Sequence, residues 1–272
     1  MTRGSSMQLA VNFSFPLVRL IQDGSIKVDR IKIPDWDGML IEAGPYGPLA
    51  VHFDLDIGFG NTLKADFERI KNLQTQTNTP HVNTHLVAPR HFNPASQKEL
   101  RDINHLWREE LNLMRRYLGD TPVAVENSPY TPDAPHLSTP ARSDVISKVI
   151  QETGSMLLLD LSHARITADT LGVDAKDYIQ SLPLDRLVEL HITGVKPFRG
   201  ILTDHFELMD ADWEILEWAL SEIQKKKWRE PDIVAFEYGG IGNIFAWRTE
   251  LRHLKSQVPV LYAMIHNYSR PH

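Results

Sequence analysis

Short runs of apolar residues recur along the whole chain, and segments with helical spacing lie between them. The runs are rich in β-branched residues and follow one another about every 32 residues, close to the roughly 31 residues of one unit in an eight-unit β/α barrel. They cover residues 9–13, 28–33, 49–57, 82–87, 123–126, 156–161, 187–192 and 233–236. In the clearest helical segment, residues 100–118, Ile103, Trp107, Leu111 and Met114 recur at spacings of three and four, which predicts one buried helix face.

The alternation of strands and helices predicts a parallel sheet, because parallel neighbours need a crossover connection. Eight units favour a closed (β/α)8 TIM barrel of the α/β class over an open doubly wound sheet. No linker or low-complexity tract divides the chain. We therefore expect a single domain over residues 1–272, with a disordered N-terminus at 1–7 and a C-terminal tail at 260–272.

Polar side chains stand where the apolar runs end. In residues 51–57 polar and apolar positions alternate, which predicts that His52, Asp54 and Asp56 share one face of a strand. The same alternation predicts inward-facing imidazoles or carboxylates at the ends of the later runs. These side chains are His81 and His85, Glu126, Asp160, Glu189 and His191, and Glu237. Active sites of TIM barrels form at the C-terminal ends of the strands, so these groups indicate such a site.

Carboxylates that gather at one barrel mouth repel one another unless they are protonated or bind cations. Imidazoles among them favour iron, manganese, zinc or cobalt over magnesium or calcium. Asp204 and His205 in the seventh loop, and His163 three residues beyond Asp160, extend the set beyond what one tetrahedral zinc ion needs. The predicted metal ligands are His52, His85, Glu126, Asp160, His163, His191, Asp204, His205 and Glu237, with Glu126 and Glu237 as candidate catalytic carboxylates.

Each of these residues also has a structural explanation. A single strand-end histidine is commonly a hydrogen-bonded packing group, and a buried carboxylate can belong to an ion pair or cap a loop. The repeated placement favours a metal site for the set as a whole, whereas a structural role is favoured for His81 and His91. The other histidines are expected to be solvated or packing residues: His105, His136, His253, His266 and His272.

Composition narrows the classes of function. Hydrophobic residues make up 42% and charged residues 24% of the 272 positions, as in an ordinary globular protein. The absence of cysteine excludes disulfides, thiolate metal sites and a cysteine nucleophile, and it suits a cytoplasmic protein. A net charge of −6 argues against a nucleic-acid substrate. The apolar pattern predicts neither a signal peptide nor a membrane span.

Five segments carry a resemblance to a known family. They are Val-Glu-Asn-Ser-Pro-Tyr at 125–130, Leu-Leu-Asp at 158–160, Val-Glu-Leu-His-Ile-Thr-Gly at 188–194, Asp-His at 204–205 and Phe-Glu-Tyr at 236–238. With them the chain resembles the DUF692 family, also called the multinuclear non-heme iron-dependent oxidases, which includes the methanobactin biosynthesis enzyme MbnB. The resemblance implies a xylose-isomerase-like TIM barrel in which two or three irons support the oxygen-dependent oxidation of a residue, commonly cysteine, in a ribosomally made peptide.

The same resemblance implies which residues and partners take part. Position by position, the ligands would be His52, His85, Glu126, Asp160, His191, Asp204, His205 and Glu237. The partners would be a peptide substrate and, in some members, a peptide-recognition protein. The chain departs from the family pattern where Asp204 and His205 are adjacent instead of Asp-x-His, where His163 replaces a common asparagine, and at residues 34–37.

Other functions also fit the same barrel and ligands. A sugar or sugar-phosphate isomerase or epimerase on the same barrel would use Glu126 and Glu237 as metal-bound acid and base, and it would work with manganese or cobalt. A catalytically inactive barrel that serves as a binding partner is a third interpretation. Phosphodiester cleavage at a zinc centre also fits the ligands, but the negative charge of the chain argues against it.

Overall fold

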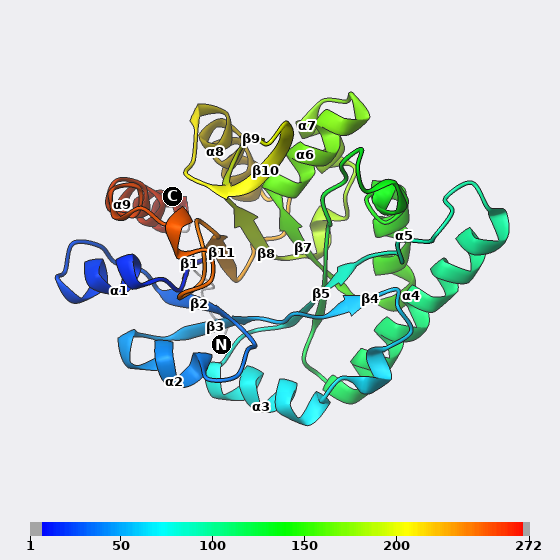
Figure 1. Ribbon diagram of the computed structural model, residues 1–272, viewed down its shortest axis with the longest axis horizontal. Helices are drawn as coiled ribbons and strands as arrows, with labels where there is room; N and C mark the ends of the chain where they lie inside the picture. Colours follow the sequence, from blue (N-terminus) through cyan, green and yellow to red (C-terminus); the bar gives the residue numbers. More distant parts are fainter. Residues whose placement is uncertain (1–6, 269–272) are drawn as a thin grey trace.

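Parallel strands curl into a barrel in the computed structural model, which describes residues 7–268 (Figure 1). The strand order is β3-β2-β1-β11-β8-β7-β6-β5-β4, and all neighbours are parallel. The strands are β1 (Gln8–Asn12), β2 (Arg30–Pro34), β3 (Leu49–His52), β4 (Asp56–Ile57), β5 (Val82–Leu86), β6 (Val123–Glu126), β7 (Met156–Asp160), β8 (Leu187–Ile192) and β11 (Ile233–Phe236). Most of their residues are buried, as both faces of a covered parallel sheet must be. This arrangement confirms the predicted single-domain TIM-barrel fold.

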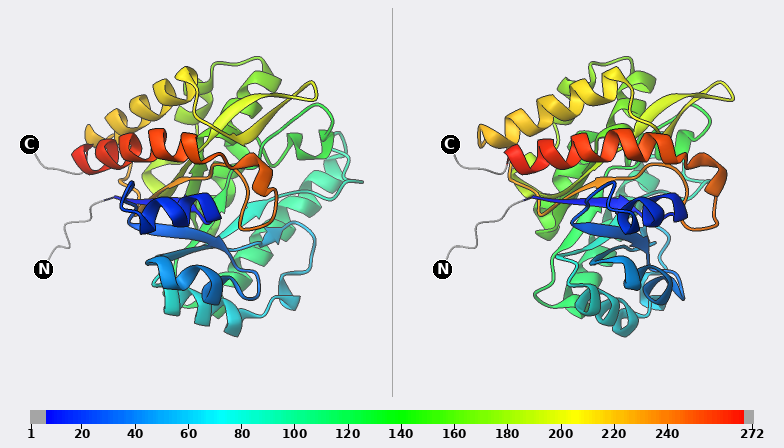
Figure 2. Two further views of the ribbon diagram at one scale, coloured as in Figure 1. Left: turned by 60° about the vertical axis from the view of Figure 1, so that its left-hand side comes forward. Right: turned by 90° about the vertical axis from the view of Figure 1, so that its left-hand side faces the viewer.

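Helices surround the strands on the outside of the barrel (Figure 1). They are α1 (Phe15–Gln22), α2 (Met39–Ala43), α3 (Phe67–Thr77), α4 (Gln97–Leu118), α5 (Ser143–Thr153), α6 (Leu161–Leu171), α7 (Ala175–Gln180), α8 (Asp210–Gln224) and α9 (Leu251–Tyr268). The predicted amphipathic helix is α4, whose Trp107 and Leu111 are fully buried. Two further strands, β9 (Gly194–Phe198) and β10 (Ile201–Phe206), form an antiparallel hairpin after β8. Figure 2 shows this yellow hairpin and the orange segment after β11 at the same end of the barrel.

The third predicted strand forms two short strands, β3 and β4. These two strands stand at opposite ends of the strand order. β3 pairs with β2 and β4 pairs with β5, but the segment between them joins neither ladder. The side chain of Asn83 explains the break, because its Oδ1 accepts the backbone N–H of Phe53 at 2.8 Å and its Nδ2 donates to the Phe53 carbonyl at 3.1 Å. The prediction that His52, Asp54 and Asp56 share one strand face is therefore wrong. Asp54 is exposed outside both strands.

An apolar layer lines part of the inside of the barrel. The apolar residues form two separate buried clusters, Ala10 with Ala50, Ile233 and Ala235, and Ala124 with Leu158 and Val188. Glu126 and Asp160 stand two positions beyond Ala124 and Leu158, so they face the same interior one layer further along the strands. The strand alternation thus places these two carboxylates beyond the apolar layer, on the same side of their strands.

Helix α9 corrects the expected C-terminal tail. Residues 260–268 are helical, and Val258, Leu261 and Ile265 are buried at helical spacing where α9 packs against α1 and β1. The last four residues of that tail and residues 1–6 of the expected disordered N-terminus lie outside the described residues, whereas Met7 is 1% exposed and belongs to the core. Over residues 7–268, no helix has the length and apolar character needed to cross a membrane.

Candidate metal centre

The nine predicted side chains meet at the C-terminal ends of the strands. His52 ends β3, His85 lies in β5, Glu126 ends β6, Asp160 ends β7, His163 lies in the first turn of α6, His191 lies in β8, Asp204 and His205 lie in β10, and Glu237 follows β11. Parallel strands that end at one rim bring groups together that are far apart in the chain. Whether these residues bind metal stays a prediction, but their proximity is a feature of the fold.

Glu126 occupies the middle of this cluster and is 1% exposed. Its Oε2 lies 3.8 Å from His52 Nε2 and 3.3 Å from His85 Nε2. Its Oε1 lies 3.5 Å from His163 Nδ1 and 3.6 Å from His191 Nδ1. One buried carboxylate therefore faces four imidazoles, with two beside each of its oxygens.

The hairpin β9–β10 brings in two residues that are adjacent in sequence. Neighbouring side chains on a regular strand point to opposite faces. Here the β9–β10 register shifts and His205 has a φ of 62°, so Asp204 and His205 both approach the centre. Asp204 Oδ2 lies 3.0 Å from His163 Nε2, and His205 Nδ1 lies 2.7 Å from the carbonyl oxygen of Glu237. The bulge and the positive φ of His205 thus allow two adjacent side chains to face the same centre.

Asp160 orients the start of α6 and also faces the cluster. Its Oδ1 accepts the backbone N–H groups of Ser162 at 2.6 Å and His163 at 2.8 Å, which caps the helix. Its Oδ2 lies 3.6 Å from His163 Nε2 and 3.8 Å from His191 Nδ1. The cap fixes where α6 begins, and so it fixes the position of His163, which is buried among carboxylates.

Hydrogen bonds hold one nitrogen of three of the histidines. Nδ1 of His163 lies 2.9 Å from the carbonyl oxygen of Asn127, Nδ1 of His205 faces a backbone carbonyl, and Nε2 of His191 lies 2.7 Å from Glu189 Oε1. Carbonyl oxygens accept, so Nδ1 of His163 and Nδ1 of His205 carry a proton and donate it, whereas Nε2 of His191 contacts both the Glu189 carboxylate and the Lys32 ammonium. The other nitrogen of each ring is left as a ligand atom, which is the usual outer-sphere arrangement of metal-binding histidines.

Buried atoms without hydrogen-bond partners lie at the same point. Within the described residues these include Glu126 Oε2, Asp160 Oδ2 and His191 Nδ1, and leaving such atoms unpaired costs free energy. Three groups of residues offer ligand atoms within 4.8 Å of one another: His52, Glu126 and His191; Glu126, Asp160 and His163; and Asp160, His191 and Glu237. The mixture of nitrogen and oxygen donors fits a transition-metal ion. Because the groups share members, the residues present also fit more than one adjacent ion.

A layer of buried ion pairs next to the cluster contains Lys32, which the sequence analysis did not select, and Glu189, which the strand alternation predicts to face inward but which is not among the predicted ligands. Lys32 is 2% exposed, and its Nζ lies 2.8 Å from Glu189, 2.9 Å from Glu237 and in contact with His191. The second oxygen of Glu189 lies 2.9 Å from His81 Nε2. His81, for which the sequence favours a structural role, therefore contacts this layer and not the cluster itself. Lys32 and Glu189 hold two candidate ligands in place.

The carboxylates and imidazoles shift one another's pKa values. Burial disfavours the charged form of Glu126, but His85 and His191 hold its pKa well below the ordinary value. Burial also opposes the charge on these imidazoles, yet Glu126 beside His85 and Glu237 beside His191 raise the pKa of each histidine to about 10. Burial and the Lys32 ammonium lower the pKa of His52 to about 3. His52 is thus neutral at pH 7, the form that binds metals.

Metal binding is expected to release protons at pH 7. The pKa of His85 and of His191 is about 10 in the metal-free protein, so both imidazoles carry a proton that coordination must displace. Calorimetric titration with Mn²⁺ in buffers of different ionisation enthalpy should show at least one proton released per ion, and the affinity should rise with pH. Titrations whose heats do not depend on the buffer would contradict this expectation.

The same two histidines should make the stability of the metal-free protein depend on pH. Their folded-state pKa of about 10 lies above the unfolded value, about 6.5, so their stabilisation is complete below about pH 6.5. It is lost as the pH rises from about 6.5 through about 10, because over this range the folded state keeps protons that the unfolded state has released. Urea unfolding between pH 6 and 10 measures this loss, and bound metal should reduce it.

Aromatic side chains surround Arg248 at the same end of the barrel. The Arg248 guanidinium lies between 5.0 and 5.8 Å from the ring centres of Phe198, Phe206, Phe245 and Trp247. Two of these rings belong to the hairpin that carries Asp204 and His205, and the exposed Phe245 and Trp247 belong to the segment after β11. An exposed apolar surface that contains cationic side chains, next to a buried ionisable cluster, is typical of a recognition surface.

Comparison with known proteins identifies the family. Residues 46–228 match the family described as RiPP precursor modification enzyme MbnB/TglH/ChrH. The chain belongs to this family. A UPF0276 protein from Acaryochloris marina is 23% identical over 214 residues, which cover 75% of this chain and 71% of that protein. A UPF0276 protein from Paraburkholderia phytofirmans is 38% identical over 95 residues, 35% of this chain and 27% of that protein. The predicted family resemblance is confirmed.

Solved structures share the fold of this MbnB/TglH/ChrH family member at low sequence identity. The xylose isomerase domain protein from Planctomyces limnophilus has a TM-score of 0.62 at 12% identity, with 97% of this chain and 99% of that chain covered. A D-psicose 3-epimerase has a TM-score of 0.58 at 14% identity, with 97% and 99% covered. An AP endonuclease of family 2 from Brucella melitensis has a TM-score of 0.51 at 15% identity, with 85% and 93% covered. These likenesses show the xylose-isomerase-like TIM-barrel fold.

Proposed function

We propose that this protein is an iron-dependent oxidase that modifies a residue, commonly cysteine, of a ribosomally made peptide. The observation that carries the proposal is the sharing of Glu126 between two groups of candidate ligands, His52 with His191 and Asp160 with His163. A shared buried carboxylate supports two adjacent ions, and the nitrogen and oxygen donors suit iron. The family to which the chain belongs is described as modifying peptide precursors, which supports the substrate class.

In this proposal each layer of the site has a separate task. Bound iron would supply the exchange of electrons with oxygen. Glu126 joins the two groups of ligands, and Glu189 holds the outer nitrogen of His191 at 2.7 Å so that Nδ1 faces the centre. The Lys32 ammonium balances the negative charge of Glu237, with Nζ 2.9 Å from Oε1. The aromatic side chains around Arg248 bind the peptide, and a peptide-recognition protein can assist this binding.

Oxygen uptake tests the proposal. Iron-loaded protein, given a short cysteine-bearing peptide encoded beside its gene, is expected to consume oxygen and to change the mass of the peptide. Anaerobic incubation should stop the reaction. Manganese-loaded protein should give no product, because Mn²⁺ is not expected to replace iron in the exchange of electrons with oxygen. An oxygen electrode and peptide mass spectra measure both outcomes. Equal product formation without oxygen would refute the oxidase function.

A metal-dependent sugar isomerase or epimerase is the alternative that a specific observation favours. Glu126 Oε1 and Glu237 Oε2 lie 3.6 and 3.5 Å from His191 Nδ1, so two carboxylates flank one ligand position. Such a pair suits the removal and return of a proton next to a carbonyl group. This function predicts oxygen-independent conversion of a ketose by manganese- or cobalt-loaded protein, which the same samples can test by sugar chromatography.

A further inference from the structure

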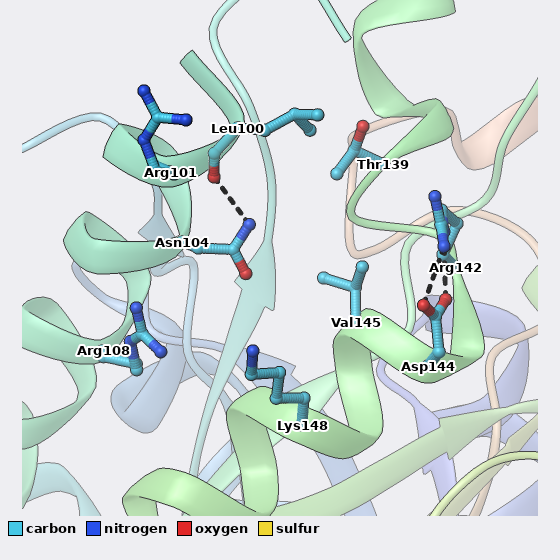
Figure 3. Close-up of a pocket in the computed structure, with 9 residues that line it drawn as sticks. All are labelled: Leu100, Arg101, Asn104, Arg108, Thr139, Arg142, Asp144, Val145 and Lys148. Atoms are coloured by element: carbon cyan, nitrogen blue, oxygen red, sulfur yellow. Dashed lines mark hydrogen bonds and ion pairs between the residues drawn. The ribbon is translucent and has the colours of Figure 1, made fainter. Parts of the chain in front are cut away.

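A groove of about 470 Å³ lies between α4 and α5 on the outside of the barrel (Figure 3). Residues of α4 line one side and residues of α5 and the segment before it line the other, with Lys148 reaching from α5 toward α4. The lining residues are Leu100, Arg101, Asn104, Arg108, Thr139, Arg142, Asp144, Val145 and Lys148. This surface contains none of the candidate metal ligands, and the proposed chemistry does not use it.

The groove is basic although the chain carries a net charge of −6. Four of its lining residues are cationic and only Asp144 is acidic. Some of this charge is balanced, since Arg142 pairs with Asp144 at 2.7 Å, and Glu152 lies 2.6 Å from Arg108 and 4.0 Å from Lys148. Two carboxylates against four cations still leave a positive surface, and the N-terminus of α5 adds its dipole to it. The groove therefore favours an anionic occupant.

Apolar and hydrogen-bonding groups lie among the charges. Leu100 and Val145 face the groove from opposite helices, as Figure 3 shows. The Asn104 side-chain Nδ2 donates to the Leu100 carbonyl at 2.7 Å, which fixes the amide and leaves its oxygen as an acceptor. No aromatic side chain lines the groove on which a nucleic-acid base would stack. Carboxylates interspersed with aliphatic side chains match this combination best.

The groove is connected by the chain to the centre of the candidate site. Thr139 and Arg142, which line it, belong to the segment that follows β6, and β6 ends at Glu126. In a TIM barrel the segment after a strand lies at the functional end, and the helix that follows runs away from that end. A peptide in the groove thus lies along α5 with one end at the rim that carries the metal ligands.

We propose that this groove binds an acidic, aliphatic segment of the peptide substrate, at a distance from the residue that is modified. The inference rests on the proposed peptide-modifying function. It assigns affinity for the peptide to Arg101, Arg108 and Lys148, and it leaves the chemistry to the metal centre. Recognition away from the reacting residue lets one barrel select its peptide without crowding the metal ligands.

The test uses a fluorescein-labelled ten-residue peptide of alternating Glu and Leu, with a Lys-Leu peptide as the comparison. Fluorescence anisotropy should show binding of the acidic peptide only, and its affinity should fall as NaCl rises from about 50 to 200 mM. The charge reversals Arg101→Glu and Lys148→Glu together should weaken binding at least tenfold, and the milder Arg101→Gln with Lys148→Gln should weaken it less. Circular dichroism checks that both variants fold.

The matched control reverses two exposed lysines elsewhere, Lys27→Glu and Lys255→Glu, and changes the net charge by the same amount. This control should bind the acidic peptide as the unaltered protein does. The proposed role of the groove would be refuted if the control bound the acidic peptide as weakly as the charge-reversed variant, or if the Lys-Leu peptide bound as tightly as the acidic peptide. Binding is measured without turnover and with or without metal, so it stands apart from the oxidase test. The proposed role of the groove would also be refuted if the charge-reversed variant oxidised the natural peptide with an unchanged KM. Binding of the acidic peptide without any oxidation would refute only the proposed oxidase function.

Discussion

Glu126→Ala protein is expected to retain less than about a tenth of the metal that the unaltered protein binds. The Glu126 carboxylate lies within 3.3–3.8 Å of His52, His85, His163 and His191, and it belongs to two of the three candidate ligand groups. Its removal takes one donor from both groups and deprives the imidazoles of the charge that balances them. Elemental analysis after anaerobic loading with iron measures the loss.

The barrel should remain folded in this variant, since the apolar layer and the helices do not depend on Glu126. A matched control is Glu110, another buried glutamate, which accepts hydrogen bonds from the backbone of Gly58 and from Thr62. Glu110→Ala should lower the melting temperature and leave the metal content unchanged. Full metal content in Glu126→Ala protein, or loss of the fold with metal binding restored on refolding, would show that Glu126 has a structural role instead.

Lys32→Met is expected to destabilise the metal-free protein by about 3–5 kcal/mol, the usual cost of removing one partner from a buried ion pair. Lys32 lies 2.8 Å from Glu189 and 2.9 Å from Glu237, and all three side chains are nearly inaccessible to water. Without the ammonium group the two carboxylates are left buried with less compensation. Urea unfolding monitored by circular dichroism gives the free energy of unfolding.

Metal should partly replace the missing charge in this variant, because Glu237 belongs to a candidate ligand group. Loading with metal is therefore expected to restore more stability to Lys32→Met protein than to the unaltered protein. The control is Lys27→Met, which removes an exposed lysine and should change stability by less than about 0.5 kcal/mol. A Lys32→Met variant as stable as this control would exclude the proposed balance of charge.

The sequence was sufficient for the architecture and for most of the cluster. Eight apolar runs at regular spacing predict the barrel, and strand alternation predicts that Glu126 stands above Ala124 and Asp160 above Leu158. Both follow from local rules, because a strand has a period of two and parallel strands end at a common rim. The grouping of the candidate ligands that lie on the barrel strands therefore needed no knowledge of which strands are neighbours.

Local sequence patterns gave the wrong bounds for one strand and one helix, because contacts with distant parts of the chain set these bounds. Residues 49–57 have the alternation of one strand, but Asn83 from the next strand takes the backbone groups of Phe53 and breaks it. Residues 260–268, expected to belong to a tail, continue α9 along α1 and β1.

Only the tertiary structure identified the ion-pair layer and the use of the Asp204-His205 pair. Lys32 lies between two isoleucines in a buried strand, which signals an unusual lysine, but its partner Glu189 is 157 positions away. The bulge that lets Asp204 and His205 both approach the centre depends on how β10 pairs with β9. A sequence shows which groups can carry charge, whereas the cost of burying a charge is set by the partners that surround it in the fold.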